Sequence, residues 1–516
     1  MQSKRDQVQA HAFVMSRLTS GMLLADPDAP ESPLGRTTRG VVIGTVIAVV
    51  ISAGAVVYGL INPGGNDSWR TANSLIVNKD TGARYLYVDG RLRPVRNYAS
   101  ALLIGGADLK TTDVRTASLR DTPVGTPVGI PGAPDSVPDS GDLDGGAWQV
   151  CSVVGTVPDA TGSRVPTAVT AVVAGAPTEA TGVGSDQGIV VSGPDKTTYL
   201  VWQGSRLRLD QASGAAVSLG YGSVAPRPVS AAFLDALVSG PDLAAPSVPG
   251  LGDKGPSLGG RSSTVGQVFQ VRVPGSNAQY YLQRREGLVP LTDTGAALVL
   301  GDPDTRKKAY GGAAPAAAVI GAAALKEHAA PGTEGRSPAS VGLPDSPPRA
   351  VDVAEDSSAC ARVEPGDAGT KVTTVLVPVA SLAPVAQPDS TSVTAACLRV
   401  DATVVRPGHG ALIRALGADG TAVGDTTYLV ADNGVKYRVP SAAALQSLGY
   451  AQSDVEALPS PLLSMLPSGP DLSPETAAGG GAGAVTTPPG CAPGGAAPGG
   501  PGVGSLSAKL PAGYGS

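Results

Sequence analysis

The sequence predicts a single transmembrane helix followed by a β-rich, α+β extracytoplasmic domain that is built of four repeats in two quasi-equivalent halves. Three observations predict this organisation. One long uncharged apolar run lies near the N-terminus, hairpin-like segments recur at fixed offsets, and only four cysteines, all widely spaced, occur in 516 residues.

The apolar run is residues 41–61, which carry no charge. A helix rises about 1.5 Å per residue, so this run spans a hydrocarbon core of roughly 30 Å. Arg36 and Arg39 lie directly before it, and the positive-inside rule then places the N-terminus in the cytoplasm and everything after residue 61 outside the inner membrane. A cleaved signal peptide is the alternative, but the segment before the run is too long for an ordinary n-region. Residues 6–24 predict a short amphipathic helix, with a partly ordered tail as the alternative.

One pair of repeats is visible in the sequence itself. TYLVWQGSRLRL at 198–209 matches TYLVADNGVKYRV at 427–439, and both lead into LGY and then SGPDL. The offset is 229 residues from Tyr199 to Tyr428 and again from Asp242 to Asp471. Chance does not hold such a register, so the chain is internally duplicated.

A second pair alternates with the first. RYLYVDGRLRPV at 84–95 matches YYLQRREGLVPL at 280–291, and ALLIGG and ALVLGD follow at the same offset of 196. Each unit opens with two runs around a Gly-containing turn, which is typical of a β-hairpin. One hairpin cannot bury its own face, so neighbouring units must cover it.

Further runs predict the remaining elements. Strands that join the halves are expected at 148–154, 168–173, 188–191, 265–273, 371–377 and 411–416, and short helices at 231–238, 442–448, 455–466 and 316–329. The last of these helices lies in an Ala/Pro-rich stretch, 311–350. Residues 479–516 form a Gly/Pro/Ala tail that is expected to be disordered.

Charge and cysteine usage limit the function classes. The net charge of −5 and the pI near 5.4 leave no basic field for a phosphate backbone, so no nucleic-acid partner is expected. The four cysteines form no CxxC pair and the three histidines are scattered, so no metal site is predicted. Cysteines in an exported chain indicate disulfides, and four buried free thiols are the alternative.

No catalytic motif is complete. The phosphate-binding pattern GxxxxGK[ST] is absent, and GDAGTK at 366–371 lacks its spacing. GPSLG at 255–259 matches the GxSxG of hydrolases but is expected to be a loop, whereas a nucleophile elbow needs a strand before it and a helix after it. Asp242 and Asp471 recur as a pair that acid/base chemistry could use, and a Pro-containing turn or helix cap explains them more simply.

Several segments resemble the EccB family of the actinobacterial type VII (ESX) secretion machinery. They are DQVQAHAFVMSRLTSGM before the membrane, ESPLGRTTRG against it, GIPGAPD at 129–135 and RPGHGALIRA at 406–415. The resemblance extends to about residue 474. It implies a structural core component that is anchored in the cell inner membrane beside EccC, EccD and EccE and is a homo-oligomer within that complex. Its exported domain would be a scaffold on the outer side of that membrane. Family members are described as ATPases, so ATP is the one cofactor that the resemblance suggests. Because the sequence lacks a phosphate-binding loop, we expect that the chain is not an enzyme.

The resemblance also implies a central β domain with the four repeats around it, and a disulfide between Cys151 and Cys360. Cys397 and Cys491 are additional to that pattern and are expected as a second pair. The predicted divisions are a cytoplasmic segment (1–39), the transmembrane helix (40–61), repeat 1 (62–145), central strands (146–197), repeat 2 (198–264), repeat 3 with the insert (265–350), central strands (351–426), repeat 4 (427–475) and the tail (476–516). The alternative functions are a cell-wall-binding or sensing module and a secretion ATPase.

Overall fold

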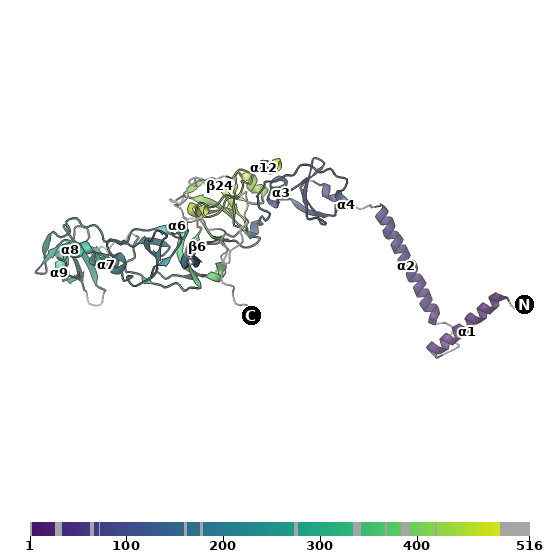
Figure 1. Ribbon diagram of the computed structural model, residues 1–516, viewed down its shortest axis with the longest axis horizontal. Coiled ribbons are helices and arrows are strands. Elements are labelled where there is room, and N and C mark those ends of the chain that lie inside the picture. The colour runs from purple at the N-terminus through teal and green to yellow at the C-terminus, as the bar shows by residue number, and fades with distance from the viewer. Residues whose placement is uncertain are drawn as a thin grey trace. The chain divides into compact units, whose positions relative to one another are not determined.

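The computed structural model describes residues 3–25, 33–61, 67–71, 73–158, 163–175, 179–272, 277–333, 342–366, 369–382, 393–398, 400–417 and 421–485. Figure 1 shows the helices and strands of the chain, which divides into two compact units. The first contains residues 1–92 and 111–124, and the second contains residues 93–110 and 125–516.

Two helices open the first unit. α1 spans Lys4–Leu24 and begins with a capping box, in which the Ser3 side chain accepts from the Asp6 amide and the Asp6 carboxylate accepts from the Ser3 amide. The helix predicted at 6–24 is therefore confirmed. α2 spans Pro33–Ile61.

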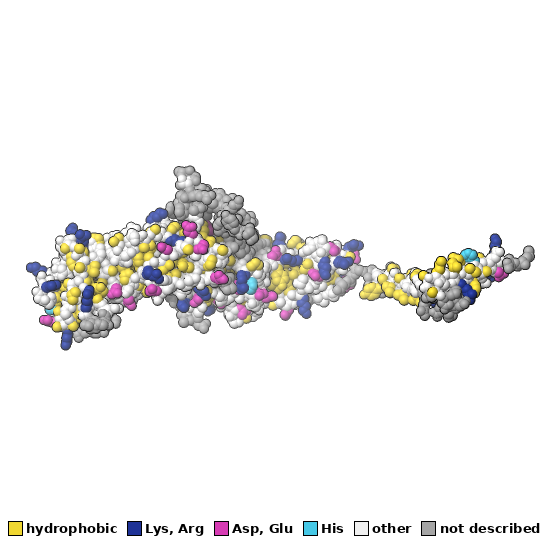
Figure 2. Space-filling view, turned by 90° about the horizontal axis from the view of Figure 1, so that it is seen from below, with side chains coloured by type: hydrophobic (Ala, Val, Ile, Leu, Met, Phe, Trp, Pro, Cys, Tyr) yellow, Lys and Arg dark blue, Asp and Glu magenta, His cyan; other side chains and the backbone are white. Residues whose placement is uncertain are grey.

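Within α2, Thr37–Gly59 is long and apolar enough to cross a membrane, with a mean hydropathy of 2.5. None of its most apolar stretch is covered by other described residues, and Val41, Val50 and Ile51 are each more than 60% exposed. Hydrophobic side chains dominate this helix in Figure 2, whereas charges of both signs are dispersed over the β-rich part of the chain. A bare apolar helix is costly in water and favourable in lipid.

The first unit also contains a four-stranded sheet, in the order β3-β2-β1-β4. β1 and β2 are antiparallel, with Ile76 opposite Tyr85. Trp69 is fully buried among Ile76, Leu92 and Val114. The elements are η1 (Asp67–Arg70), β1 (Ser74–Asn78), β2 (Arg84–Val88), β3 (Arg91–Pro94), β4 (Lys110–Val114) and α4 (Thr116–Leu119).

A six-stranded sheet lies in the second unit, in the order β22-β6-β5-β20-β21-β7. Its strands come from two distant parts of the chain, and the two parts meet where β5 pairs with β20, and also where β22 pairs with β6 and where β21 pairs with β7. The strands are β5 (Trp148–Pro158), β6 (Arg164–Val173), β7 (Thr181–Gly182), β20 (Ser357–Glu364), β21 (Lys371–Pro378) and β22 (Ala402–Val404). The predicted strands at 148–154, 168–173 and 371–377 are confirmed.

Three further sheets of the second unit are each built around a hairpin. Their orders are β11-β8-β9-β10-β12 with β19 on β8, β17-β16-β15-β18, and β25-β24-β23-β26, and β13 and β14 form a separate ribbon. The strands are β8 (Gln187–Ser192), β9 (Thr198–Trp202), β10 (Ser205–Arg208), β11 (Arg227–Pro228), β12 (Val238–Ser239), β13 (Lys254–Leu258), β14 (Arg261–Thr264), β15 (Val268–Val271), β16 (Gln279–Arg284), β17 (Gly287–Leu291), β18 (Ala318–Val319), β19 (Arg349–Ala350), β23 (Ala411–Leu416), β24 (Ala422–Val430), β25 (Lys436–Val439) and β26 (Glu456–Pro459).

Short helices cover these sheets. α3 packs against both α10 and α12, and α7 packs against α5. The helices are α3 (Tyr98–Gly105), α5 (Ala215–Ser218), α6 (Ala231–Ala236), α7 (Asp293–Gly301), α8 (Pro303–Ala309), α9 (Ala322–His328), α10 (Ala442–Ser447), α11 (Ser460–Ser464) and α12 (Pro474–Gly479), with the 3-10 turns η2 (Ser140–Asp142), η3 (Val379–Leu382) and η4 (Gln452–Asp454).

Three predictions of secondary structure were wrong in part. The helix predicted at 455–466 begins instead as β26, because this segment pairs in parallel with β23, and only its second half is helical. The helix predicted at 316–329 is confined to α9, because β18 pairs with β15 before it. The loop predicted at 255–259 is mostly β13. The tail predicted to be disordered is ordered at 476–485, because α12 extends to Gly479 and the Asp471 amide donates to the Ala484 carbonyl at 2.8 Å. The rest of the tail, from residue 486 onward, lies outside the described residues.

Candidate functional site

The central sheet holds the disulfide that joins its two parts. Cys151 of β5 and Cys360 of β20 face each other in the antiparallel register and are bonded. Both are fully buried beside Val173, Val375 and Val377, and they are separated by 209 residues of sequence. Cys397 is also disulfide-bonded, and Cys491, the partner predicted for it, lies outside the described residues.

The two hairpins that match in sequence also match in register. Arg208 lies opposite Tyr199 in β9–β10, and Arg438 lies opposite Tyr428 in β24–β25. Each SGPDL segment then runs back beside its hairpin. The amide of Leu243 donates to the carbonyl of Arg208 at 2.8 Å, and the amide of Leu472 donates to that of Arg438, also at 2.8 Å.

The aspartates of these segments bind the hairpin arginines. Asp242 pairs with Arg208, and Arg438 Nη1 lies 2.9 Å from Asp471 Oδ2. The Arg208 guanidinium lowers the pKa of Asp242 below its usual range. The sequence-based interpretation of Asp242 and Asp471 as part of a turn or a helix cap therefore missed their ion pairs with Arg208 and Arg438. Each carboxylate fastens its segment to its own hairpin, an arrangement we call the Arg–Asp clasp.

The two clasps should differ in strength. Asp471 is 11% exposed in its side chain, while Arg208 and Asp242 are about half exposed. Removing a hydrogen-bonded charge from the buried clasp by Asp471→Ala should cost about 2 to 3 kcal/mol. Asp242→Ala should cost about 0.5 to 1 kcal/mol, because water screens an exposed pair. Hydrogen exchange over residues 427–472 and 198–243 would measure both, and equal losses of protection would contradict the difference.

Two tyrosines of the LGY motifs make contacts that the sequence did not reveal. The Tyr450 hydroxyl donates to the Pro138 carbonyl at 2.7 Å, and the Tyr221 hydroxyl donates to the Pro348 carbonyl, also at 2.7 Å. Both prolines end a PDSxP sequence, at 134–138 and 344–348. The duplication of PDSxP was the available signal, but it does not identify the tyrosine that each copy meets.

A buried lysine, Lys436, is the first residue of β25, in the sheet that contains the hairpin β24–β25. Lys436 is 2% exposed, and its ammonium donates to the Leu463 carbonyl in the last turn of α11. Burial disfavours the charged form and lowers the pKa of Lys436 to about 8. The amine therefore supports the end of a helix at a cost in desolvation.

Stability should rise with pH because of this lysine. Between pH 8 and the unfolded value near 10.5, the unfolded chain binds more protons than the folded chain, so the free energy of unfolding increases with pH. Below pH 8 the amine is charged in both states and the slope vanishes. Lys436→Met should remove this slope, whatever its effect at neutral pH. Urea unfolding from pH 7 to 10.5 would measure it, and an unchanged slope in the variant would refute the assignment.

The RPGHG loop holds a third ion pair. Arg406 binds Asp144, a buried residue, and this contact raises the pKa of Arg406. His409 Nδ1 lies 3.4 Å from the same carboxylate. The Asp144 amide also donates to the Gly410 carbonyl at 2.7 Å. Residues 144 and 406–410 are therefore joined through both backbone and side chains.

The residues predicted to set membrane topology lie at the start of α2. Arg36 immediately precedes the apolar stretch Thr37–Gly59, and Arg39 lies in its first turn. Arg39 is exposed, as a residue at the membrane surface would be. The orientation that they specify remains a prediction.

The hydrolase-like motif is not a nucleophile elbow. Ser257 lies in β13, which turns back into β14 to form a hairpin. An elbow needs a helix after the serine, so this serine lacks the required geometry. Among the described residues, no group of three His, Cys, Asp or Glu side chains could hold a metal ion. GDAGTK at 366–371 lies partly outside the described residues.

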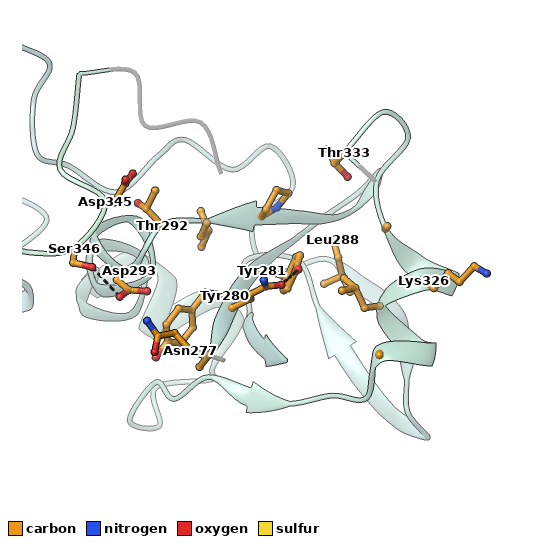
Figure 3. Close-up of a pocket in the computed structure, with 17 residues that line it drawn as sticks. Asn277, Tyr280, Tyr281, Leu288, Thr292, Asp293, Lys326, Thr333, Asp345 and Ser346 are labelled. Carbon is orange, nitrogen blue, oxygen red and sulfur yellow. Dashed lines mark hydrogen bonds between the residues drawn. The ribbon is translucent and has the colours of Figure 1, made fainter. Parts of the chain in front are cut away.

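An open pocket of about 630 Å³ lies between β16, β17, α7 and α9 (Figure 3). Tyr280 and Tyr281 contribute aromatic side chains, and Asp293 and Ser346 meet at one end. The Ser346 hydroxyl donates to Asp293 Oδ2 at 3.0 Å. α9 comes from the Ala/Pro-rich insert, so the insert forms one wall.

Comparison with known proteins identifies the family. A family model described as the type VII secretion system ESX-1, transport TM domain B, matches residues 1–482. The ESX-3 secretion system ATPase EccB3 of Mycolicibacterium smegmatis is 30% identical over 490 residues, which cover 91% of this chain and 89% of that protein. The chain belongs to the EccB family of type VII (ESX) secretion system membrane components. The resemblance expected from the motifs is thus confirmed.

Solved structures share the EccB fold. One is a chain of an intact ESX-5 inner membrane complex, with a TM-score of 0.58 and 26% identity over 92% of this chain and 95% of that one. Another is the EccB3 dimer from the ESX-3 core complex, with a TM-score of 0.59 and 25% identity over 78% of this chain and 99% of that one. The EccB fold is one apolar helix with a large mixed α/β domain of several small sheets.

Proposed function

We propose that this EccB chain is a structural, membrane-anchored core component of a type VII secretion complex. The observation that carries the proposal is the use of its recurring charged and polar residues. Arg208, Asp242, Arg438 and Asp471 fasten the chain to itself, as a scaffold requires, and the membrane-length helix precedes all of them.

The proposed architecture is four repeats in two quasi-equivalent halves around the central sheet. Repeats 1, 2, 3 and 4 correspond to residues 62–145, 198–264, 265–350 and 427–475, and the central domain to 146–197 and 351–426. The matched registers of β9–β10 and β24–β25 support this division. Two equivalent tyrosine contacts also support it. Tyr221 of repeat 2 binds Pro348 near the end of repeat 3, and Tyr450 of repeat 4 binds Pro138 near the end of repeat 1.

The proposed topology is a single pass through the inner membrane, with residues 1–39 in the cytoplasm and residues 62–516 outside. Arg36 and Arg39 support it through the positive-inside rule. The buried bond between Cys151 and Cys360 also fits an oxidising compartment. Alkaline phosphatase fused after residue 485 should be active, and the same enzyme fused at residue 30 should be inactive. The reverse pattern would overturn the topology.

The proposed partners are EccC-, EccD- and EccE-like membrane components together with further copies of this chain. The ESX-5 inner membrane complex and the EccB3 dimer, both similar in fold, support this assignment. Mild-detergent purification with mass spectrometry of the copurifying proteins is the test. A large particle that contains an FtsK-like ATPase is expected, and a lone monomer would contradict the scaffold.

ATP hydrolysis is the second candidate, because relatives carry ATPase in their names. The sequence offers no GxxxxGK[ST] loop to hold the phosphates. An exported domain also faces a compartment with no ATP supply of its own. Phosphate release by the purified chain should stay at the background rate. Turnover that a single substitution abolishes would establish the ATPase instead.

A further inference from the structure

The pocket of Figure 3 has an apolar and aromatic middle. Tyr281 of β16 lies opposite Pro290 of β17 on the same face of the sheet, and Leu325 of α9 packs beside it. The Tyr281 hydroxyl donates to Gln279 Oε1 at 2.9 Å, which fixes the ring. Tyr280 lines the pocket from the neighbouring position. A flat ring and aliphatic side chains suit the methylene stem of a long side chain.

One end of the pocket is acidic. Asp293 is the first residue of α7, where the helix dipole favours a carboxylate, and its oxygen accepts from Ser346. Asp345 lies beside Ser346 at the same end (Figure 3). Both carboxylates are exposed, and in the described part of the chain no Lys or Arg lies within ion-pair distance of either.

The charge distribution excludes one class of ligand and favours another. Among the described residues, Lys326 is the one cation that lines the pocket, and its side chain points away from the centre in Figure 3. A phosphate or nucleotide would meet two carboxylates without a cation to balance them. A cation would gain both carboxylates and the face of the Tyr281 ring, which attracts positive charge.

We propose that this pocket binds a lysine or arginine side chain presented by an extended peptide. The stem lies along Tyr281 and Leu325, and the charged head reaches Asp293 and Asp345. The cavity volume accommodates this side chain with its neighbouring residues. The proposal goes beyond the scaffold and does not depend on it, because all the residues that line the pocket belong to one chain.

The test is fluorescence anisotropy with the full chain in mild detergent. The probes are labelled acetyl-Ala-Leu-Lys-Leu-Ala-amide and its analogues with arginine, norleucine or glutamate at the centre. The lysine and arginine peptides should bind about tenfold more tightly than the norleucine peptide. The glutamate peptide should not bind, and added salt should weaken the binding of the cationic peptides.

Variants locate the binding. Asp293→Asn and Tyr281→Leu should each weaken the lysine peptide about tenfold, and Asp345→Asn serves where either variant folds poorly, since its side chain forms no described hydrogen bond. Asp304→Asn is the matched control, because Asp304 is an exposed acid of α8 that pairs with Lys308 outside the pocket. The proposal would be overturned by equal affinity for the lysine and norleucine peptides or by unchanged affinity in the pocket variants. Tighter binding of chitotetraose, a model of a cell-wall sugar chain, would also overturn it.

Discussion

Replacing both cysteines of the central disulfide, in a Cys151→Ala/Cys360→Ala chain, should lower the free energy of unfolding of the exported domain by about 5 kcal/mol. The bond closes a loop of 209 residues. In the chain-entropy description, a loop of that length restricts the unfolded chain by roughly this amount. The bond also crosses the line where the first-half strands β5 and β6 meet the second-half strands β20 and β21. Loss of the bond should therefore loosen the contact between the halves first.

Urea unfolding and hydrogen exchange over β5 and β20 would measure this effect. Cys397→Ala is the control, because Cys397 is exposed and lies outside the central strands, so its loss should leave the hydrogen-exchange protection of β5 and β20 in place. A comparable loss of β5 and β20 protection in the control would mean that the loss of any disulfide, rather than of the bond between β5 and β20, destabilises these strands. Retention of β5 and β20 protection in the double variant would show that strand pairing alone holds the halves together.

The sequence predicted the hairpins well because their signals are local. Tyr199 and Tyr428, the Gly-containing turns and the arginines that follow occupy a few neighbouring positions, so one short window contains the whole element. Offsets of 229 and 196 then established the duplication without any structure. α2 was equally accessible, because an uncharged apolar run of membrane length has few alternatives.

Contacts between distant segments could not be predicted in the same way. Tyr450 and Pro138 are 312 residues apart, and nothing local to either residue names the other. The prediction of a helix at 455–466 was wrong in part for a related reason. A short apolar run is compatible with a strand or a helix, and the parallel pairing with the distant β23 makes its first half a strand. The pocket depends on α9 of the insert folding against β17, and the composition predicted a helix in the insert but not the strand on which it packs.

The turn of the β9–β10 hairpin is a place where one added methyl group should be severely destabilising. Gln203 and Gly204 both have positive φ, 47° and 76°, so the turn is of the type that favours glycine in its second position. Gly204 is buried, and its amide donates to Thr374 Oγ1 of β21 at 3.1 Å. A Cβ at Gly204 would overlap the carbonyl oxygen of Val372. The hairpin tip therefore contacts the central sheet through bare backbone.

Gly204→Ala should cost about 4 kcal/mol or more, because it adds a backbone clash to the strain of a left-handed residue. Gly90→Ala is a closely matched control. Asp89 and Gly90 form the same kind of turn with φ of 51° and 74°, but a Cβ at Gly90 meets nothing within 4 Å. Strain alone should then cost about 1 to 2 kcal/mol. Hydrogen exchange over each hairpin would separate the two terms, and equal losses would show that conformation, rather than docking on β21, makes Gly204 necessary.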